Sequence, residues 1–141
     1  MNVELRLVTS DSDIEGCFDA FSVLRPHLKR AEFLSLVRLQ QRQSYQILAV
    51  AVEGTFPSAA GFRIQNFLAW GHVLYVDDLT TVPQARGRGY ASQLLAWLIE
   101  HAKAKSCHAV HLDTGYGRHE AHKLYLKVGF RLKSHHMALE L

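Results

Sequence analysis

The stretch Thr80–Ser92 constrains the fold of this chain more than any other part of the sequence. A β-rich run leads into a short glycine-containing loop, and a helical pattern begins directly after Gly89. A strand that enters a helix through such a loop points several backbone N–H groups at one place, where the helix dipole adds about half a positive charge. Gly87 and Gly89 let the backbone approach a bulky group closely, and Arg86 and Arg88 add positive charge. The stretch therefore predicts an anion site, and we expect its ligand to be a pyrophosphate.

Two common phosphate-binding motifs do not fit this loop. The P-loop needs a Lys followed by Ser or Thr after its glycines, and the dinucleotide fingerprint needs a third glycine where this chain has Ser92. The pattern Arg/Gln-x-x-Gly-x-Gly/Ala does fit, both from Arg86 to Ala91 and, two residues earlier, from Gln84 to Gly89. In this respect the chain resembles the GCN5-related N-acetyltransferases (GNAT), whose acetyl-CoA loop has this signature. The resemblance implies that the pyrophosphate of acetyl-CoA is bound by Arg86, Gly87, Arg88, Gly89, Tyr90, Ala91 and Ser92.

Length and composition set wide limits on fold and partners. The 141 residues, 48% hydrophobic and 21% charged, predict one globular domain spanning 1–141. Apolar runs are far shorter than the roughly 20 residues that cross a membrane, and no signal-peptide core follows Met1, so we expect a cytoplasmic protein without a membrane partner. The net charge of +3 comes from scattered Lys and Arg outside any nucleic-acid-binding motif. Of the nine histidines, His119 and His122 could share a helix face, but no carboxylate–histidine motif completes a metal site. We therefore expect neither a nucleic-acid partner nor a metal.

Hydrophobic periodicity predicts an α/β fold with the order β-α-α-β-β-β-α-β-α-β-β. The expected strands are Met1–Leu7, Tyr45–Val52, Ala59–Leu68, Val73–Val82, His108–Asp113, Phe130–Lys133 and His136–Leu141. The expected helices are 10–24, Leu28–Gln41, Gly89–Lys105 and Arg118–Val128. This order matches that of the GNAT family across nearly the whole chain, and it implies a mostly antiparallel mixed sheet with helices on both faces.

A second segment, Ala121–Phe130, resembles the family's Ala-x-x-Leu-Tyr-x-Lys-x-Gly-Phe sequence. By that resemblance, Tyr125 lies near the cofactor sulfur and protonates the departing thiolate, which a phenol with a pKa of about 10 can do at neutral pH. The alternative is a half-buried tyrosine that only packs the helix. Where many relatives have an Asn that contacts the cofactor, this chain has Arg118, which would contact a phosphate or the acceptor.

The strand before the glycine loop contains Asp77 and Asp78, which strict alternation would place on opposite faces. Freeing the lone pair of an alkyl ammonium at pH 7 costs about 4–5 kcal/mol, at ~1.4 kcal/mol per pKa unit, so acetylation gains from a base. Because the family often supplies a carboxylate from this strand, Asp78 is the first candidate and Asp77 the second. The alternative is that both are structural. The resemblance further implies that the backbone of Thr80, Thr81 and Val82 pairs with the pantetheine arm, one amide polarising the thioester carbonyl.

These features predict an acetyl-CoA-dependent N-acetyltransferase that acts on a primary amine by direct transfer in a ternary complex. Arg118–Tyr125 resembles a stretch of small bacterial acetyltransferases, including aminoalkylphosphonate acetyltransferases, which favours a small-molecule acceptor. Two alternatives are a non-catalytic acetyl-CoA or CoA sensor and an N-acetyltransferase of proteins or peptides. A homodimer is a further expectation, because the family is often dimeric.

Overall fold

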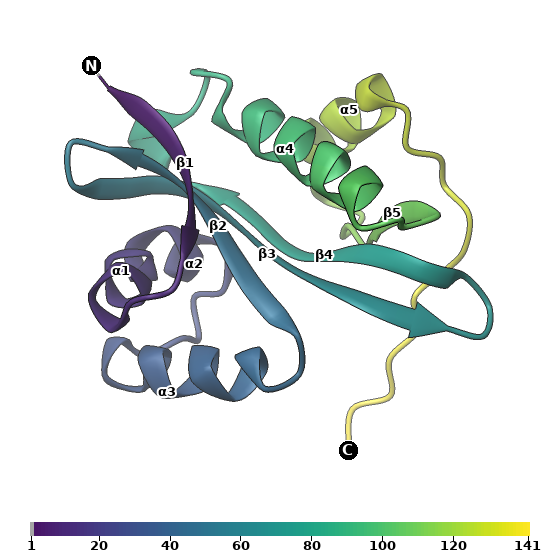
Figure 1. Cartoon of the computed structure of the whole chain (residues 1–141), viewed down its shortest axis with the longest axis horizontal. Coiled ribbons are helices and arrows are strands. Elements are labelled where there is room, and N and C mark those ends of the chain that lie inside the picture. Colours follow the sequence, from purple (N-terminus) through teal and green to yellow (C-terminus); the bar gives the residue numbers. More distant parts are fainter. Residues whose placement is uncertain (1) are drawn as a thin grey trace. The chain divides into compact units, whose positions relative to one another are not determined.

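A computed structural model describes residues Asn2–Leu141 and divides into two compact units, one ending at His111 and the other formed by Leu112–Leu141. A five-stranded sheet has the strands in sequence order (Figure 1). Its strands are β1 (Val3–Val8), β2 (Tyr45–Val52), β3 (Thr55–Phe67), β4 (Gly71–Thr81) and β5 (Ala109–Leu112). The pairs from β1 to β4 are antiparallel, and a helix crosses from β4 to β5. The expected mixed, mostly antiparallel sheet is confirmed.

Helices cover both faces of this sheet. On one face lie α1 (Asp11–Gly16), α2 (Phe18–Leu24) and α3 (Arg30–Gln41), and on the other lies α4 (Tyr90–Ala104), as Figure 1 shows. This two-sided cover explains why the apolar run Ile47–Val52 in β2 is buried at every position rather than at alternate ones. The second unit contains α5 (His119–Val128).

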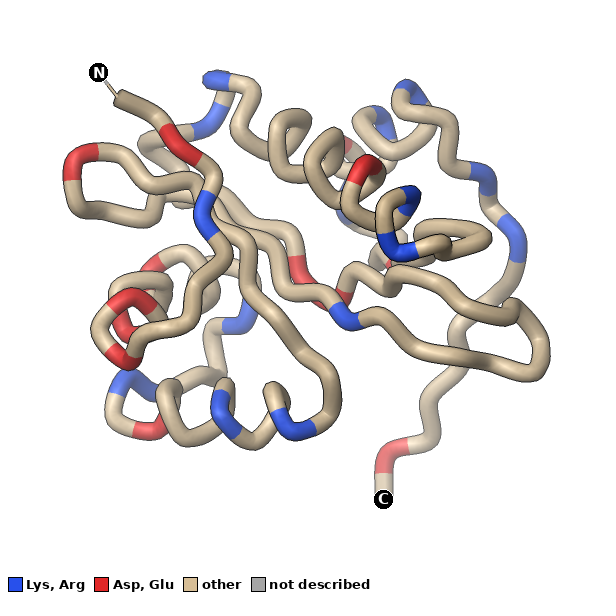
Figure 2. The backbone as a smooth tube through the Cα atoms, viewed as in Figure 1, with Lys and Arg blue, Asp and Glu red and all other residues tan. Residues whose placement is uncertain are grey.

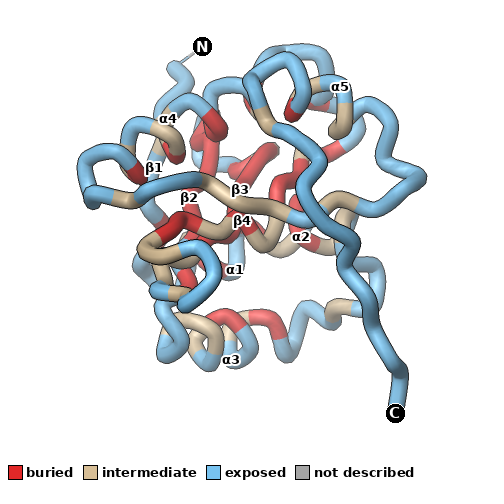
Figure 3. The backbone as a smooth tube through the Cα atoms, turned by 90° about the vertical axis from the view of Figure 1, so that its right-hand side faces the viewer, coloured by how far each residue is buried: buried red, intermediate tan, exposed pale blue. Residues whose placement is uncertain are grey.

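Two sets of apolar side chains form the core of the first unit. On the α1–α3 face, Ile47 and Ala49 of β2 belong to a buried cluster with residues of those three helices, namely Ile14, Phe21, Phe33 and Val37. Alternation turns Leu48 and Val50 to the α4 face, to which α4 contributes the fully buried Leu94, Leu95 and Leu98. Figure 3 shows the buried stretches running through the strands between the helices.

Several boundaries depart from the sequence-based expectation; β3, for example, begins at Thr55 and not at Ala59. The single helix expected over 10–24 is two helices that meet at Cys17. Gly16 weakens the helix at this point. It also lies so close to the ring of Phe56 that a Cβ on residue 16 would be 2.9 Å from a ring atom. The strand expected from Met1 begins at Val3 in the structure, and Met1 itself lies outside the described residues.

The two strands expected at the C-terminus, Phe130–Lys133 and His136–Leu141, are wrong. The described residues 130–141 contain no strand, and their apolar side chains Leu132, Met137 and Leu139 are each more than four-fifths exposed. Alternating apolar residues form a strand only when a neighbouring strand satisfies their backbone groups, and here none does. Among the described residues no helix is long and apolar enough to span a membrane.

Removal of side-chain volume from the α4 face should destabilise the first unit. Leu98 is fully buried, and Leu98→Ala should lower the free energy of unfolding by about 2–5 kcal/mol, measured by urea denaturation. Leu36→Ala is the matched control, since Leu36 is 39% exposed on α3, and should cost less than about 1 kcal/mol. Equal losses in the two variants would contradict the placement of the core.

Candidate functional site

The glycine loop forms an open cradle at the start of α4. Gly87 and Gly89 have positive φ angles of 78° and 80°, and a Cβ at either position would meet no atom within 4 Å. Gly89 is the N-cap of α4 without any side-chain cap, so the first N–H groups of this helix are left for a ligand. A pocket at this place is lined by Thr81, Ala85, Arg86, Gly87, Gly89, Tyr90, Ala91 and Ser92. Figure 2 shows positive charge, in blue, on the loop that precedes α4.

These features suit a pyrophosphate. Uncapped N–H groups at the N-terminus of a fifteen-residue helix favour an anion, and two glycines with open space beside them admit a bulky one. Arg88 bonds only weakly to its own loop, with Nη2 at 3.5 Å from the Gln84 carbonyl oxygen. The structure thus brings together, in one pocket, most of the residues that the sequence assigned to the cofactor.

Of the three strand-end residues expected to pair with the pantetheine arm, Thr81 has the most suitable backbone. The N–H of Val82 donates to the Pro57 carbonyl at 2.9 Å, so it is already used within the sheet. Because backbone groups alternate along an antiparallel strand, those of Thr81 then point away from β3. The Thr80 side chain is buried and donates to the Ala20 carbonyl of α2 at 2.8 Å. Thr81 therefore offers what an added strand needs, whereas Val82 and the Thr80 side chain hold the strand in place.

A β-bulge separates Asp77 from the regular register of β4. Phe62 pairs with Val76 and Gly61 pairs with Asp78, which leaves Asp77 as the extra residue. An extra residue resets the alternation of the strand, so that Asp77 and Asp78 both face α1–α3. The expectation that they face opposite sides is wrong for this reason.

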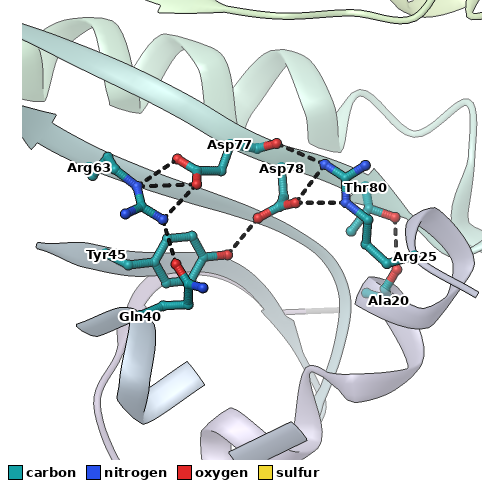
Figure 4. A network of polar contacts seen from close by, with 8 residues as sticks. All are labelled: Ala20, Arg25, Gln40, Tyr45, Arg63, Asp77, Asp78 and Thr80. Atoms are coloured by element: carbon teal, nitrogen blue, oxygen red, sulfur yellow. Dashed lines mark hydrogen bonds and ion pairs between the residues drawn. The ribbon is translucent and has the colours of Figure 1, made fainter. Parts of the chain in front are cut away.

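The two carboxylates enter one polar network, drawn in Figure 4. Both oxygens of Asp77 accept hydrogen bonds from Arg63 of β3, the shortest at 2.7 Å. Asp78 Oδ1 accepts from Nε and Nη2 of Arg25, at 3.1 and 2.9 Å, and its Oδ2 accepts from the Tyr45 hydroxyl at 2.7 Å. Arg25 also donates to the backbone carbonyl of Asp77 at 3.1 Å. Two cations thus match two anions across β2, β3, β4 and the end of α2.

Electrostatics in this network depend on burial. Burial raises the pKa of Asp77, and the neighbouring Arg63 opposes that shift. Burial, together with the charge of Asp78, raises the pKa of Tyr45 well above its usual value, so this phenol remains a hydrogen-bond donor. Each carboxylate oxygen of Asp78 already has a hydrogen-bond partner within this network.

Arg25, Tyr45, Gly61 and Arg63 did not stand out in the sequence. Only Gly61 gave a usable signal, because an isolated glycine inside a strand pattern indicates a bulge or a close backbone approach.

Tyr125 lies on α5 in the second unit. It is 6% exposed, its ring meets Phe130 edge to face at 5.7 Å between centroids, and the helix ends at Gly129. Burial raises the pKa of Tyr125, while the positive charge of Arg118 lowers it. The phenol is therefore protonated at neutral pH, as a proton donor must be. Arg118 is the N-cap residue of this helix.

Comparison with known proteins identifies the family. The model of the acetyltransferase (GNAT) family matches residues 14–130. The chain belongs to the GNAT family. It is 26% identical to an uncharacterized N-acetyltransferase of Bacillus subtilis, YhdJ, over 94% of this chain and 95% of that protein. It is also 26% identical to the glucosamine 6-phosphate N-acetyltransferase of Trypanosoma brucei brucei, over 100% of this chain and 97% of that protein.

A solved GNAT structure agrees with the fold. The aminoglycoside N-acetyltransferase AAC(6')-Iy, in complex with CoA, superimposes with a TM-score of 0.84 at 17% identity, over 99% of this chain and 95% of that one. The expectation of a GNAT N-acetyltransferase is confirmed, and structural neighbours of this GNAT chain bind CoA. Among residues Asn2–Leu141, no group of three or more His, Cys, Asp or Glu side chains could hold a metal ion.

Loss of the partner of Asp77 should destabilise the bulge. Arg63→Met should lower the free energy of unfolding by about 2–4 kcal/mol at pH 7, because it leaves a largely buried carboxylate unpaired. Lys103→Met, which breaks an exposed ion pair with Glu100, should cost less than about 1 kcal/mol. Both values come from urea denaturation.

The loss in Arg63→Met should also depend on pH. Burial raises the pKa of Asp77, so without Arg63 the folded state binds a proton more tightly than the unfolded state does. The difference from the parent protein should therefore be greatest at neutral pH and shrink as the pH falls toward the carboxyl range. A loss that does not change with pH would show that the carboxylate is not the cause.

Proposed function

We propose that this GNAT chain transfers the acetyl group of acetyl-CoA to the primary amine of a small molecule, by direct attack in a ternary complex. The observation that carries this proposal is the glycine cradle at the uncapped N-terminus of α4, with Arg86 and Arg88 beside it. The small-molecule acceptor is supported by the relative named for glucosamine 6-phosphate, which aligns over the whole of this chain. We propose further that both units act as one acetyltransferase domain, since the family match includes parts of each.

In the proposed reaction the amine nitrogen attacks the thioester carbonyl carbon, a C–N bond forms, and the C–S bond breaks. The loop residues Arg86–Ser92 bind the pyrophosphate, and the outward backbone groups of Thr81 bind the pantetheine arm as an added strand would. A backbone amide of this strand end polarises the carbonyl. These contacts hold acetyl-CoA and leave the acceptor free to enter.

Two side chains transfer the protons of this reaction, one from the amine and one to the thiolate. The amine must lose a proton before or during attack, and we assign its removal to Asp78 acting through water, with Asp77 as the second candidate. The leaving thiolate takes a proton from Tyr125, whose burial keeps the phenol neutral. The positive charge of Arg118 lowers the pKa of Tyr125, and in this proposal it also attracts a phosphate or an anionic acceptor. A cytoplasmic location and a homodimer remain predictions.

Acetyl-CoA binding tests the first part of this proposal. Isothermal titration at physiological salt should show binding by the parent chain, and Gly89→Ala should weaken it at least about tenfold, because a Cβ at φ 80° strains the turn that presents the helix N-terminus. Gly54→Ala has the same strain in the β2–β3 turn, away from the pocket, and should leave affinity unchanged. Absence of binding by the parent chain would end the proposal.

A panel of amines tests the second part, with release of free CoA thiol as the readout. The panel contains glucosamine 6-phosphate, glucosamine, 2-aminoethylphosphonate, spermidine and a peptide with a free N-terminal amine. We expect turnover with at least one small amine. Acetylation of the peptide alone would favour a protein N-acetyltransferase, and binding without any turnover would favour a sensor.

Tyr125→Phe should lower kcat about 100-fold and leave acetyl-CoA affinity unchanged, because only the donated proton is removed. Tyr116→Phe is the control, since Tyr116 is 82% exposed and its hydroxyl meets the His135 ring at 3.2 Å. Equal kcat in the parent chain and Tyr125→Phe would assign Tyr125 to packing.

A further inference from the structure

On the α1–α3 face of the sheet, the Tyr45 side chain fills the space that a side chain at position 61 would need. A Cβ on residue 61 would lie 1.7 Å from Tyr45 Oη and 2.3 Å from Cζ, so the phenol crosses the strand where only glycine leaves room. Gly61 is paired with Ile47 on one side and with Asp78 on the other. The Tyr45 ring therefore lies directly over Gly61, and its hydroxyl donates to Asp78 Oδ2 at 2.7 Å.

The hydroxyl of Tyr45 is a buried polar group that donates to the Asp78 carboxylate. The residue is 6% exposed, and its raised pKa keeps the proton on the phenol oxygen. Arg63, which binds Asp77, also lies over the Tyr45 ring, with its guanidinium carbon 5.3 Å from the ring centroid. The two residues of the bulge are thus tied to each other through Tyr45 and Arg63.

Asp78 is held from two sides that differ in rigidity. Tyr45 reaches it from within the sheet, whereas Arg25 reaches it from the end of α2 with a side chain that is 44% exposed. The buried contact sets the orientation of the carboxylate, because a phenol confined between β2, β3 and α3 has few alternative rotamers. The exposed arginine can move while the buried contact is kept.

We propose that Tyr45, seated on Gly61, is a positioning residue for acetyl transfer: it holds the Asp78 carboxylate and the β4 bulge in the geometry that the reaction uses. The inference rests on the proposed function, in which Asp78 accepts the proton of the amine through water. Tyr45 touches neither substrate, and it acts through Asp78. Gly61 is necessary for this role of Tyr45, because any side chain at position 61 would displace the phenol.

Tyr45→Phe tests the hydroxyl alone, because the ring can still lie on Gly61. With the panel amine that the parent chain turns over fastest, kcat should fall between about 10- and 100-fold. The acetyl-CoA dissociation constant and the acceptor KM should stay within about threefold of the parent values. Thr55→Val is the matched control: it removes another sheet hydroxyl, which donates to the Val52 carbonyl at 2.7 Å in the β2–β3 hairpin, and it should leave kcat unchanged.

Gly61→Ala separates positioning from a merely structural role. Alone, this substitution should lower both Tm and kcat, since the new Cβ expels the phenol. Adding Tyr45→Ala frees the space, so the double variant should regain Tm relative to Gly61→Ala alone and yet keep the low kcat. Recovery of kcat together with Tm would overturn the proposal, because the phenol would then serve packing only.

The positioning role of Tyr45 and the acetyl-transfer function can be disproved separately. If the parent chain binds acetyl-CoA and turns over an amine while Tyr45→Phe is equally active, the positioning role alone is overturned. If the parent chain turns over no amine in the panel, the acetyl-transfer function falls, and the role of Tyr45 in it falls too. A selective loss of kcat in Tyr45→Phe, with the hairpin control unaffected, supports both.

Discussion

One extra residue in β4 determines how the carboxylates of Asp77 and Asp78 are arranged. The bulge at Asp77 turns two successive carboxylates to the same face of the sheet, where regular alternation would have separated them. Two like charges so close would repel each other. An arginine pairs with each of them, Arg63 with Asp77 and Arg25 with Asp78. The bulge and its ion pairs therefore depend on each other: without the arginines the carboxylates would destabilise the bulge, and without the bulge they would not meet.

The two halves of the candidate site use different chemistry. The cradle before α4 consists mainly of backbone, with two glycines at positive φ and the first turn of α4, so it offers an anion N–H groups and a helix dipole more than particular side chains. The network on β4 consists of side chains from three strands and the end of α2. Backbone recognition suits a cofactor common to a whole family. Side-chain networks are free to differ among its members, and this chain's combination of Tyr45, Gly61 and Arg25 is one such solution.

The sequence allowed most of the fold to be predicted, because its signals there are local. The glycine loop followed by the amphipathic α4 has one sensible interpretation, and the strands from Tyr45 to Thr81 carry clear apolar runs. The errors occur where distant groups decide. His136–Leu141 alternates like a strand, yet no strand of the described chain pairs with it. Asp77 and Asp78 looked like a simple alternating pair, since a bulge is a relation between two strands and leaves only Gly61 as a hint in one of them.

The sequence by itself determined the class of this protein: a GNAT fold, an anion cradle before α4, and the residue types that its acetyl-transfer chemistry would need. The cradle follows from the backbone preferences of one short segment, and the fold and the residue types follow from the resemblance of two short motifs to the family. The tertiary structure alone decided the environment of Asp77 and Asp78. Arg25, Tyr45 and Arg63 lie between 14 and 53 positions away from these carboxylates along the chain, and only the pairing of β2, β3 and β4 brings them together. Burial, hydrogen bonding and charge pairing act through space, so the state of a carboxylate depends on neighbours that the linear sequence does not reveal.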